Sequence, residues 1–182
     1  LGATYPGKWA GVAPCAGYPT LMGYGSADGK IPEGSQNPAE QMLLRASSPS
    51  NVLALAANYK ASGIYILHGD ADRTVSVEYA REMRKVLSSF HPDFSYYEYP
   101  NGAHWYGDHS VDWPALFDFF KWHTIPKAED VDTLNFTTAN PAISATYQWI
   151  GIEQQETPLQ YSNLQVRRNK TSKSITIATK NV

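Results

Sequence analysis

The strongest hydrophobic pattern along the chain is a continuous apolar run, "GIYILHG", at residues 63–69. Such a run is typical of a strand that is covered on both faces. Apolar residues then recur at helical spacing over 75–90, which predicts an amphipathic helix, and "FSYYEYP" at 94–100 predicts a second strand. Another helical pattern follows at 109–123, and a run of small apolar residues at 8–17 suits a buried strand. This alternation predicts an α/β fold with parallel strands joined by crossover helices.

The pattern changes after the last of these helices. Beyond the charged linker "PKAEDVD", segments such as "ISATYQWIGIEQQ" and "SKSITIATKNV" alternate between apolar and polar residues, with no helical periodicity. We therefore expect an α/β part over 1–125 and a small, β-rich C-terminal module over 126–182. Within the first part, residues 18–38 are rich in Gly, Pro, Ser and Asp, which predicts a long loop. Short helices are expected at 38–46 and 51–61.

Composition narrows the classes of function. The 182 residues carry a formal net charge of −2, so no strong field points to nucleic acid or to an anionic membrane surface. No stretch approaches the ~20 apolar residues of a membrane-spanning helix. The one cysteine, Cys15, excludes an internal disulfide and a thiolate-rich metal cluster. We therefore expect neither nucleic acid nor membrane as a partner.

Ionisable residues follow the two central strands. Asp70 and Asp72 come directly after the strand at 63–69, and His104 comes after the strand at 94–100. Open parallel sheets place their chemistry in loops at the carboxyl ends of the strands. A carboxylate followed by a histidine is also the second half of the Ser…Asp…His order of the α/β-hydrolases. In such a triad the histidine takes the proton of the nucleophile, and the aspartate holds the ring in one tautomer.

Three segments resemble one known family. "HGDADRTV" is similar to the HGxxDxxV signature of the prolyl oligopeptidase-like branch of the α/β-hydrolases, and "YPNGAHW" resembles its strand-then-histidine segment. "LGATYPGKWAGVAPCAG" resembles the segment after the nucleophile elbow, so the resemblance covers roughly residues 1–123. It implies a serine hydrolase, either a peptidase or an esterase, with Asp72 as the triad acid and His104 as the base. The substrate would be a peptide or an ester, and no metal or organic cofactor would be needed.

The G-x-S-x-G elbow of that family is absent from this sequence. The elbow, and the oxyanion hole that its backbone helps to form, are expected upstream of Leu1. The chain would then be a piece of a longer protein that holds the acid and base of a triad without the nucleophile. We expect such a chain to be inactive alone, and its fold to be a partial α/β-hydrolase sheet followed by a small all-β module.

Other interpretations of the same residues stay open. Asp72 could be a loop or helix-cap carboxylate, since Asp is favoured before helices, and Asp70 competes with it as the acid. His104, Asp108 and His109 lie close enough in sequence to suggest a metal site. The whole chain could also be a non-catalytic binding or structural protein, with a degenerate hydrolase scaffold and an interaction surface on the β module.

Four residues are candidates for contact with a substrate. Tyr18, Met22 and Tyr24 lie in the long loop, where hydrolases of this fold often build pocket walls, and Trp105 follows His104. The loop residues could equally cover apolar surface left by neighbouring strands.

The remaining expectations concern the other histidines, the sheet edge and the location. His68 should support the loop that follows it, and His91 and His123 should face solvent. A sheet without its early strands exposes an open edge, through which we expect self-association. The polar, Asn- and Thr-rich β module suits a secreted or periplasmic setting.

Overall fold

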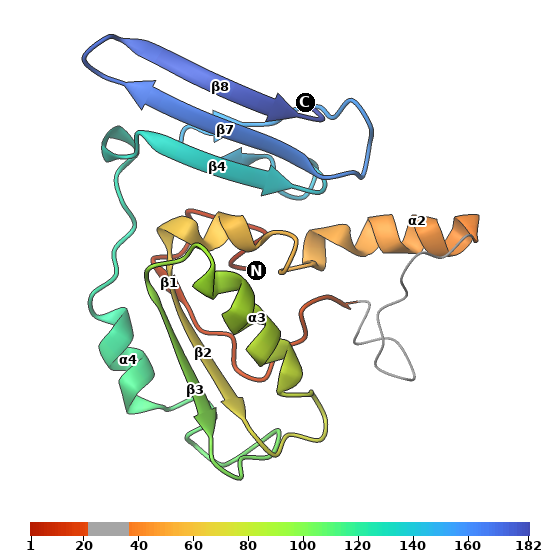
Figure 1. Cartoon of the computed structure of the whole chain (residues 1–182), viewed down its shortest axis with the longest axis vertical. Coiled ribbons are helices and arrows are strands. Elements are labelled where there is room, and N and C mark those ends of the chain that lie inside the picture. Colours follow the sequence, from red (N-terminus) through yellow and green to blue (C-terminus); the bar gives the residue numbers. More distant parts are fainter. Residues whose placement is uncertain (22–36) are drawn as a thin grey trace.

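A sheet of three parallel strands lies at the centre of the N-terminal part (Figure 1), in a computed structural model that describes residues 1–21 and 37–182. The strands are β1 (Gly11–Val12), β2 (Gly63–Gly69) and β3 (Phe94–Tyr99), in the order β1-β2-β3. Helix α3 (Glu78–Ser88) connects β2 to β3, and α4 (Pro114–Phe120) follows β3. The expected mixed α/β class, with parallel strands and a crossover helix, is therefore present.

Strand β2 is buried along its whole length because both of its faces are covered. Ile64 and Ile66 belong to a core that α3 completes with Ala80, Met83 and Leu87. On the opposite face, Tyr65 and Leu67 pack with Leu116 of α4. This double burial is the physical reason for the continuous apolar run in the sequence.

Two expected elements are shorter than their hydrophobic patterns. The segment at 8–17 runs beside β2, and the Leu67 N–H donates to Pro14 O, but only two residues form a strand. Pro14 has no N–H to donate, which interrupts the ladder. The expected helix at 109–123 begins only at Pro114, because proline favours the first turn of a helix and the residues before it form turns.

Short helices precede β2. Helix α2 (Pro38–Ser47) begins where the Asn37 side chain accepts a hydrogen bond from the Ala39 N–H, and this confirms the helix expected there. The next turns are the 3₁₀ helices η1 (Ser48–Ser50) and η2 (Ala56–Ala61), so the second expected helix forms only in its second half.

The C-terminal strands are antiparallel. The sheet order is β4-β7-β8, and β5 and β6 form a separate hairpin. A second core lies between this sheet and the hairpin region, built from Leu134, Phe136, Tyr147, Ile152, Leu164 and Val166. The bounds of these elements are β4 (Thr133–Thr138), β5 (Thr146–Tyr147), β6 (Ile150–Gly151), β7 (Ser162–Asn169) and β8 (Ser174–Lys180), after the 3₁₀ turn η3 (Ala128–Asp130).

One buried amide joins this β module to the α/β part. Asn58 of η2 is 1% exposed, and its Nδ2 donates to Ala3 O at 2.7 Å and to Thr137 O at 2.8 Å. Its Oδ1 accepts from the Thr137 N–H at 2.8 Å. Asn58 therefore completes the hydrogen bonding of β4 as a neighbouring strand would. The module consequently lies at the end of the sheet where β2 and β3 begin (Figure 1).

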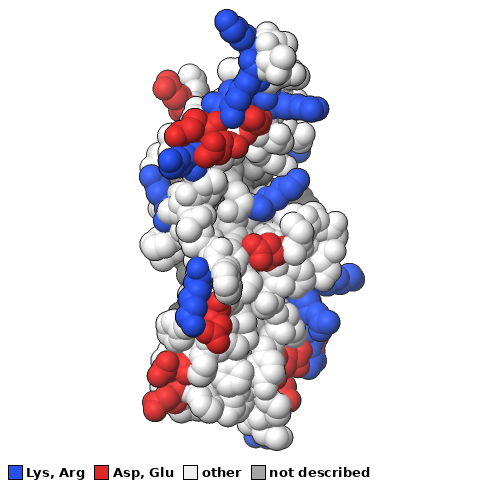
Figure 2. All heavy atoms as spheres, turned by 90° about the vertical axis from the view of Figure 1, so that its left-hand side faces the viewer, with Lys and Arg blue, Asp and Glu red and all other residues white. Residues whose placement is uncertain are grey.

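The surface carries no large field of one sign on the face drawn in Figure 2, where basic and acidic side chains are intermixed. This agrees with the small net charge of −2.

Strands β1 and β3 are each paired on one side in the described part of the chain, so both edges of the parallel sheet are open there. Self-association through such an edge stays a prediction.

Asn58→Ala should lower the free energy of unfolding by about 2–4 kcal/mol, because the Thr137 N–H and two carbonyl groups lose their buried partner. Denaturant unfolding of both proteins measures the difference. Asn51→Ala is the matched control, since it removes one exposed side-chain bond to the Ala54 N–H and should cost less than about 1 kcal/mol. Equal losses in the two variants would contradict the role given to Asn58.

Candidate functional site

The loops after β2 and β3 meet through an unusually close backbone contact. A Cβ at Gly69 would overlap the carbonyl oxygen of Gly102, and a Cβ at Gly102 would lie 2.9 Å from Gly69 Cα. The Asp70 N–H donates to Tyr99 O at 3.1 Å, and the Ala71 N–H donates to Gly102 O at 2.9 Å. These cross-loop bonds require glycine at both positions, and they fix the loop of Asp72 against the loop of His104.

Asp72 and His104 are brought together at this edge of the sheet. The His104 Nδ1 lies 2.9 Å from Asp72 Oδ2, and the Asp72 side chain is fully shielded from solvent. The other carboxylate oxygen, Oδ1, accepts from the N–H groups of Thr74 at 2.8 Å and Val75 at 2.9 Å. Asp72 thus caps its own turn with one oxygen and holds the imidazole with the other. Both interpretations of this aspartate therefore describe real contacts.

The charge state of Asp72 follows from these contacts. Burial alone would raise the pKa of the carboxyl, but the hydrogen bonds from Val75, His104 and Thr74 outweigh it and hold the pKa below its ordinary value. The carboxylate is therefore ionised near neutral pH. An ionised Asp72 accepts a hydrogen bond from the His104 Nδ1–H, and the lone pair of the neutral ring is then on Nε2.

The His104 ring can exchange a proton with a bound group. Its side chain is 45% exposed, although Nδ1 is held by a buried carboxylate. With the tautomer inferred from the Asp72 contact, Nε2 is the basic atom. A buried acid that orients a partly exposed imidazole is the arrangement a general base requires.

His68 is a third member of this site. It is 1% exposed, and its Nε2 lies 3.0 Å from Val75 O and 3.3 Å from Asp72 Oδ2. Since both neighbours are acceptors, Nε2 carries the proton and donates it. The expected support of the loop is confirmed, but the contact with the Asp72 carboxylate was not predicted. The position of His68, four residues before Asp72 at the end of a buried strand, was the available signal.

A pocket of about 200 Å³ opens beside His104. Trp105, which is 61% exposed, forms part of its wall, and no Asp, Glu, Lys or Arg lines it within the described residues. Its full lining is Cys15, Ala16, His104, Trp105, Tyr106, Ser110 and Val111. Burial raises the pKa of the Cys15 thiol, so this cysteine stays protonated and is a poor nucleophile. The pocket therefore suits an uncharged group placed next to His104.

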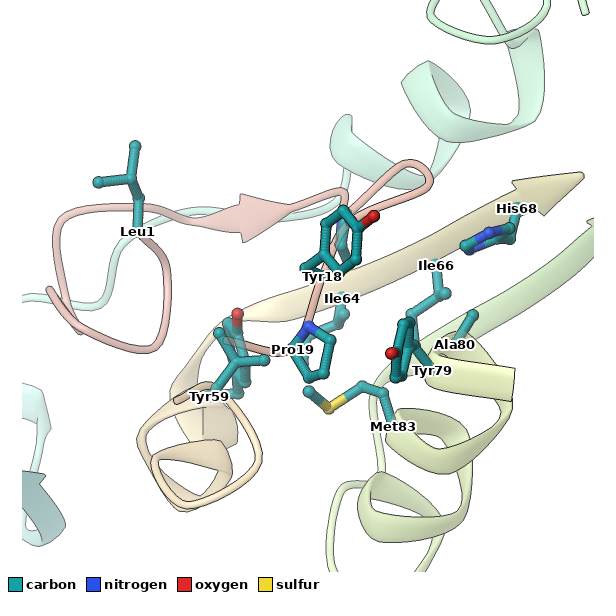
Figure 3. Close-up of a pocket in the computed structure, with 13 residues that line it drawn as sticks. Leu1, Tyr18, Pro19, Tyr59, Ile64, Ile66, His68, Tyr79, Ala80 and Met83 are labelled. Atoms are coloured by element: carbon teal, nitrogen blue, oxygen red, sulfur yellow. The ribbon is translucent and has the colours of Figure 1, made fainter. Parts of the chain in front are cut away.

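Tyr18, another candidate for substrate contact, does not line this pocket. Tyr18 lies in the wall of a different cavity (Figure 3), and its hydroxyl donates to Thr74 O at 3.1 Å. It therefore supports the loop that carries Asp72. Met22 and Tyr24 lie outside the described residues.

The neighbouring acids and histidines have other partners. Asp70 is exposed, and the Tyr99 hydroxyl lies 3.0 Å from His109 Nδ1. Within residues 1–21 and 37–182, no three His, Cys, Asp or Glu side chains are grouped to hold a metal ion.

The expectation that His91 faces solvent is wrong. His91 is 5% exposed, because its ring lies within hydrogen-bond distance of backbone groups of Tyr59, Ser62 and Asp93. His123 is also largely covered, against Asp93.

The comparisons with known proteins give a distant relative. The chain is 26% identical, over 179 residues and 94% of its length, to an uncharacterized secreted protein of Arthroderma benhamiae. It spans only 18% of the length of that protein. No family model and no solved structure matches the chain. The name of this relative agrees with the expected secreted or periplasmic setting. No described helix is long and apolar enough to span a membrane.

Gly69→Ala should separate the two loops and remove the Asp72–His104 hydrogen bond, because the added methyl group meets backbone rather than a movable side chain. The ¹⁵N and ¹H resonances of His104 Nδ1–H, followed by NMR, report that bond. Gly17→Ala is the control, since a Cβ there meets no atom within 4 Å. An unchanged Nδ1–H signal in Gly69→Ala would contradict the dependence on this contact.

Asp72→Asn should reduce the dependence of stability on pH in the acid range. Because the folded pKa of Asp72 lies below its unfolded value of about 3.9, its ionisation stabilises the folded chain above that value, and this stabilisation is lost as pH falls through the folded pKa. Unfolding free energies should therefore differ most between the two proteins above about pH 5 and converge toward about pH 2. Asp70→Asn is the control in the same loop. If the unfolding free energies of Asp72→Asn and the unmodified chain differed by the same amount at every pH, the lowered pKa of Asp72 would be contradicted.

Proposed function

We propose that this chain carries the acid and base of a secreted serine hydrolase, with Asp72 as the orienting acid and His104 as the general base. The observation that carries the proposal is the 2.9 Å contact between a fully buried carboxylate and a partly exposed imidazole at the carboxyl edge of parallel strands. Chemistry in open parallel sheets is concentrated at this edge. The contact supports the triad order that the resemblance to prolyl oligopeptidase-like hydrolases implies.

The nucleophilic serine would come from residues outside this chain, because the sequence has no G-x-S-x-G. The serine Oγ would lie next to His104 Nε2, which accepts its proton as Oγ attacks a peptide or ester carbonyl. The same nitrogen then returns the proton to the leaving group. No metal or organic cofactor takes part in these steps.

The pocket beside His104 supports an uncharged group next to the scissile bond. Besides His104 and the protonated Cys15 thiol, its lining is aromatic, aliphatic or Ser110, whose Oγ already accepts from the Tyr106 N–H at 2.9 Å. A charged group would lose hydration there without gaining a partner among the described residues. Peptides and esters both offer such uncharged groups.

The proposal is tested on the longer protein of which this chain is taken to be a part, with a fluorophosphonate probe that labels activated serines. Labelling should occur in the longer protein, and His104→Ala and Asp72→Asn should slow it by about three to four orders of magnitude. His109→Ala is the matched control, because it removes an exposed histidine of the same loop and should label at the unmodified rate. Labelling that is insensitive to His104→Ala would overturn the proposal and favour a binding or structural role.

A further inference from the structure

A second cavity of about 200 Å³ lies between β2 and α3, on the face of the sheet opposite α4 (Figure 3). Ile64 and Ile66 of β2 form one side, and Ala80 and Met83 of α3 form the other. The rings of Tyr18 and Tyr79, with centroids 5.8 Å apart, lie along it. No Lys, Arg, Asp or Glu side chain lines it within the described residues, so its walls favour an uncharged ligand.

The size of the cavity limits the ligand. Sites for drug-sized molecules measure about 300–1,000 Å³. An engineered cavity of about 150 Å³ with aliphatic and aromatic walls binds benzene. A volume near 200 Å³ therefore matches one aromatic ring or a short aliphatic chain.

One polar atom is available to such a ligand. His68 lines the cavity at one end, and both of its polar contacts are made by Nε2. Every buried side-chain nitrogen and oxygen in the described part of the chain has a hydrogen-bond partner. His68 Nδ1 has no hydrogen-bond partner among the described residues. It is therefore not one of the fully buried atoms, although the residue as a whole is only 1% exposed. Nε2 carries the proton, so Nδ1 is the acceptor that His68 can offer to a ligand in this cavity.

We propose that this cavity binds a small uncharged molecule with one hydroxyl group, a phenol or a short-chain alcohol, whose hydroxyl donates to His68 Nδ1. The apolar body would lie between the tyrosine rings and Met83. The same imidazole contacts Asp72 Oδ2 through Nε2, so a ligand on Nδ1 is one side chain away from the Asp72–His104 pair. The site itself does not depend on the proposed hydrolase activity.

Titration of the 182-residue chain with phenol, followed by NMR of methyl-labelled methionine, tests the proposal. The Met83 methyl resonance should shift and saturate, while Met42, an exposed residue of α2 that is absent from the cavity wall, should not respond. Anisole has the same ring without a hydroxyl donor, and should bind roughly three- to tenfold more weakly than phenol.

Ala80→Leu narrows the cavity and should weaken phenol binding at least tenfold. Ala115→Leu is the matched control, because it makes the same change at an exposed helical position on α4. The cavity assignment is overturned if Met83 shows no saturable shift, or if Ala80→Leu binds phenol as tightly as the unmodified chain. The role of His68 is overturned if anisole binds as tightly as phenol. The comparison of anisole with phenol uses the unmodified chain, so it tests the role of His68 even if Ala80→Leu does not fold.

Discussion

The close approach of Gly69 to Gly102 is the constraint on which the candidate site depends. Adjacent parallel strands already end at the same edge of a sheet, about 4.8 Å apart, but this spacing alone leaves their loops free to diverge. With no Cβ on either residue, the two loops can exchange backbone hydrogen bonds directly. Asp72 and His104 then come from loops whose relative position is set by backbone, which is stiffer than side-chain packing.

The buried carboxylate of Asp72 is stable because each of its oxygens has its own hydrogen-bond partners. Oδ1 receives two N–H groups of its own turn, so the loop shape and the ionised form support one another. Oδ2 faces His104 Nδ1 and, at 3.3 Å, His68 Nε2. Desolvation would favour the neutral acid, and the hydrogen bonds together reverse that preference. The ionised acid thus orients the His104 imidazole within the folded chain itself.

Local patterns in the sequence predicted those features of the structure that arise from a single strand, helix or loop. The apolar run of β2 and the periodicity of α3 each reflect burial of a single segment. The strand ends offered Asp70, Asp72 and His104, and the resemblance to the HGxxDxxV signature selected Asp72 as the partner of His104. His91 and Asn58 could not be found in this way, because each is buried to satisfy backbone groups more than 25 residues distant. The cavity between Tyr18 and Tyr79 likewise arises only when remote segments pack together.

The position of the β module constrains what it can contribute. It is joined to the amino end of the sheet through Asn58, whereas Asp72 and His104 lie at the carboxyl end (Figure 1). The seven residues of β2 separate the two ends by about 23 Å. In the proposed hydrolase, a substrate group beside His104 would reach the described part of the module only in an extended polymer of that length. For smaller substrates of the proposed hydrolase, the module would act on the site through the stability of the sheet that carries Asp72 and His104.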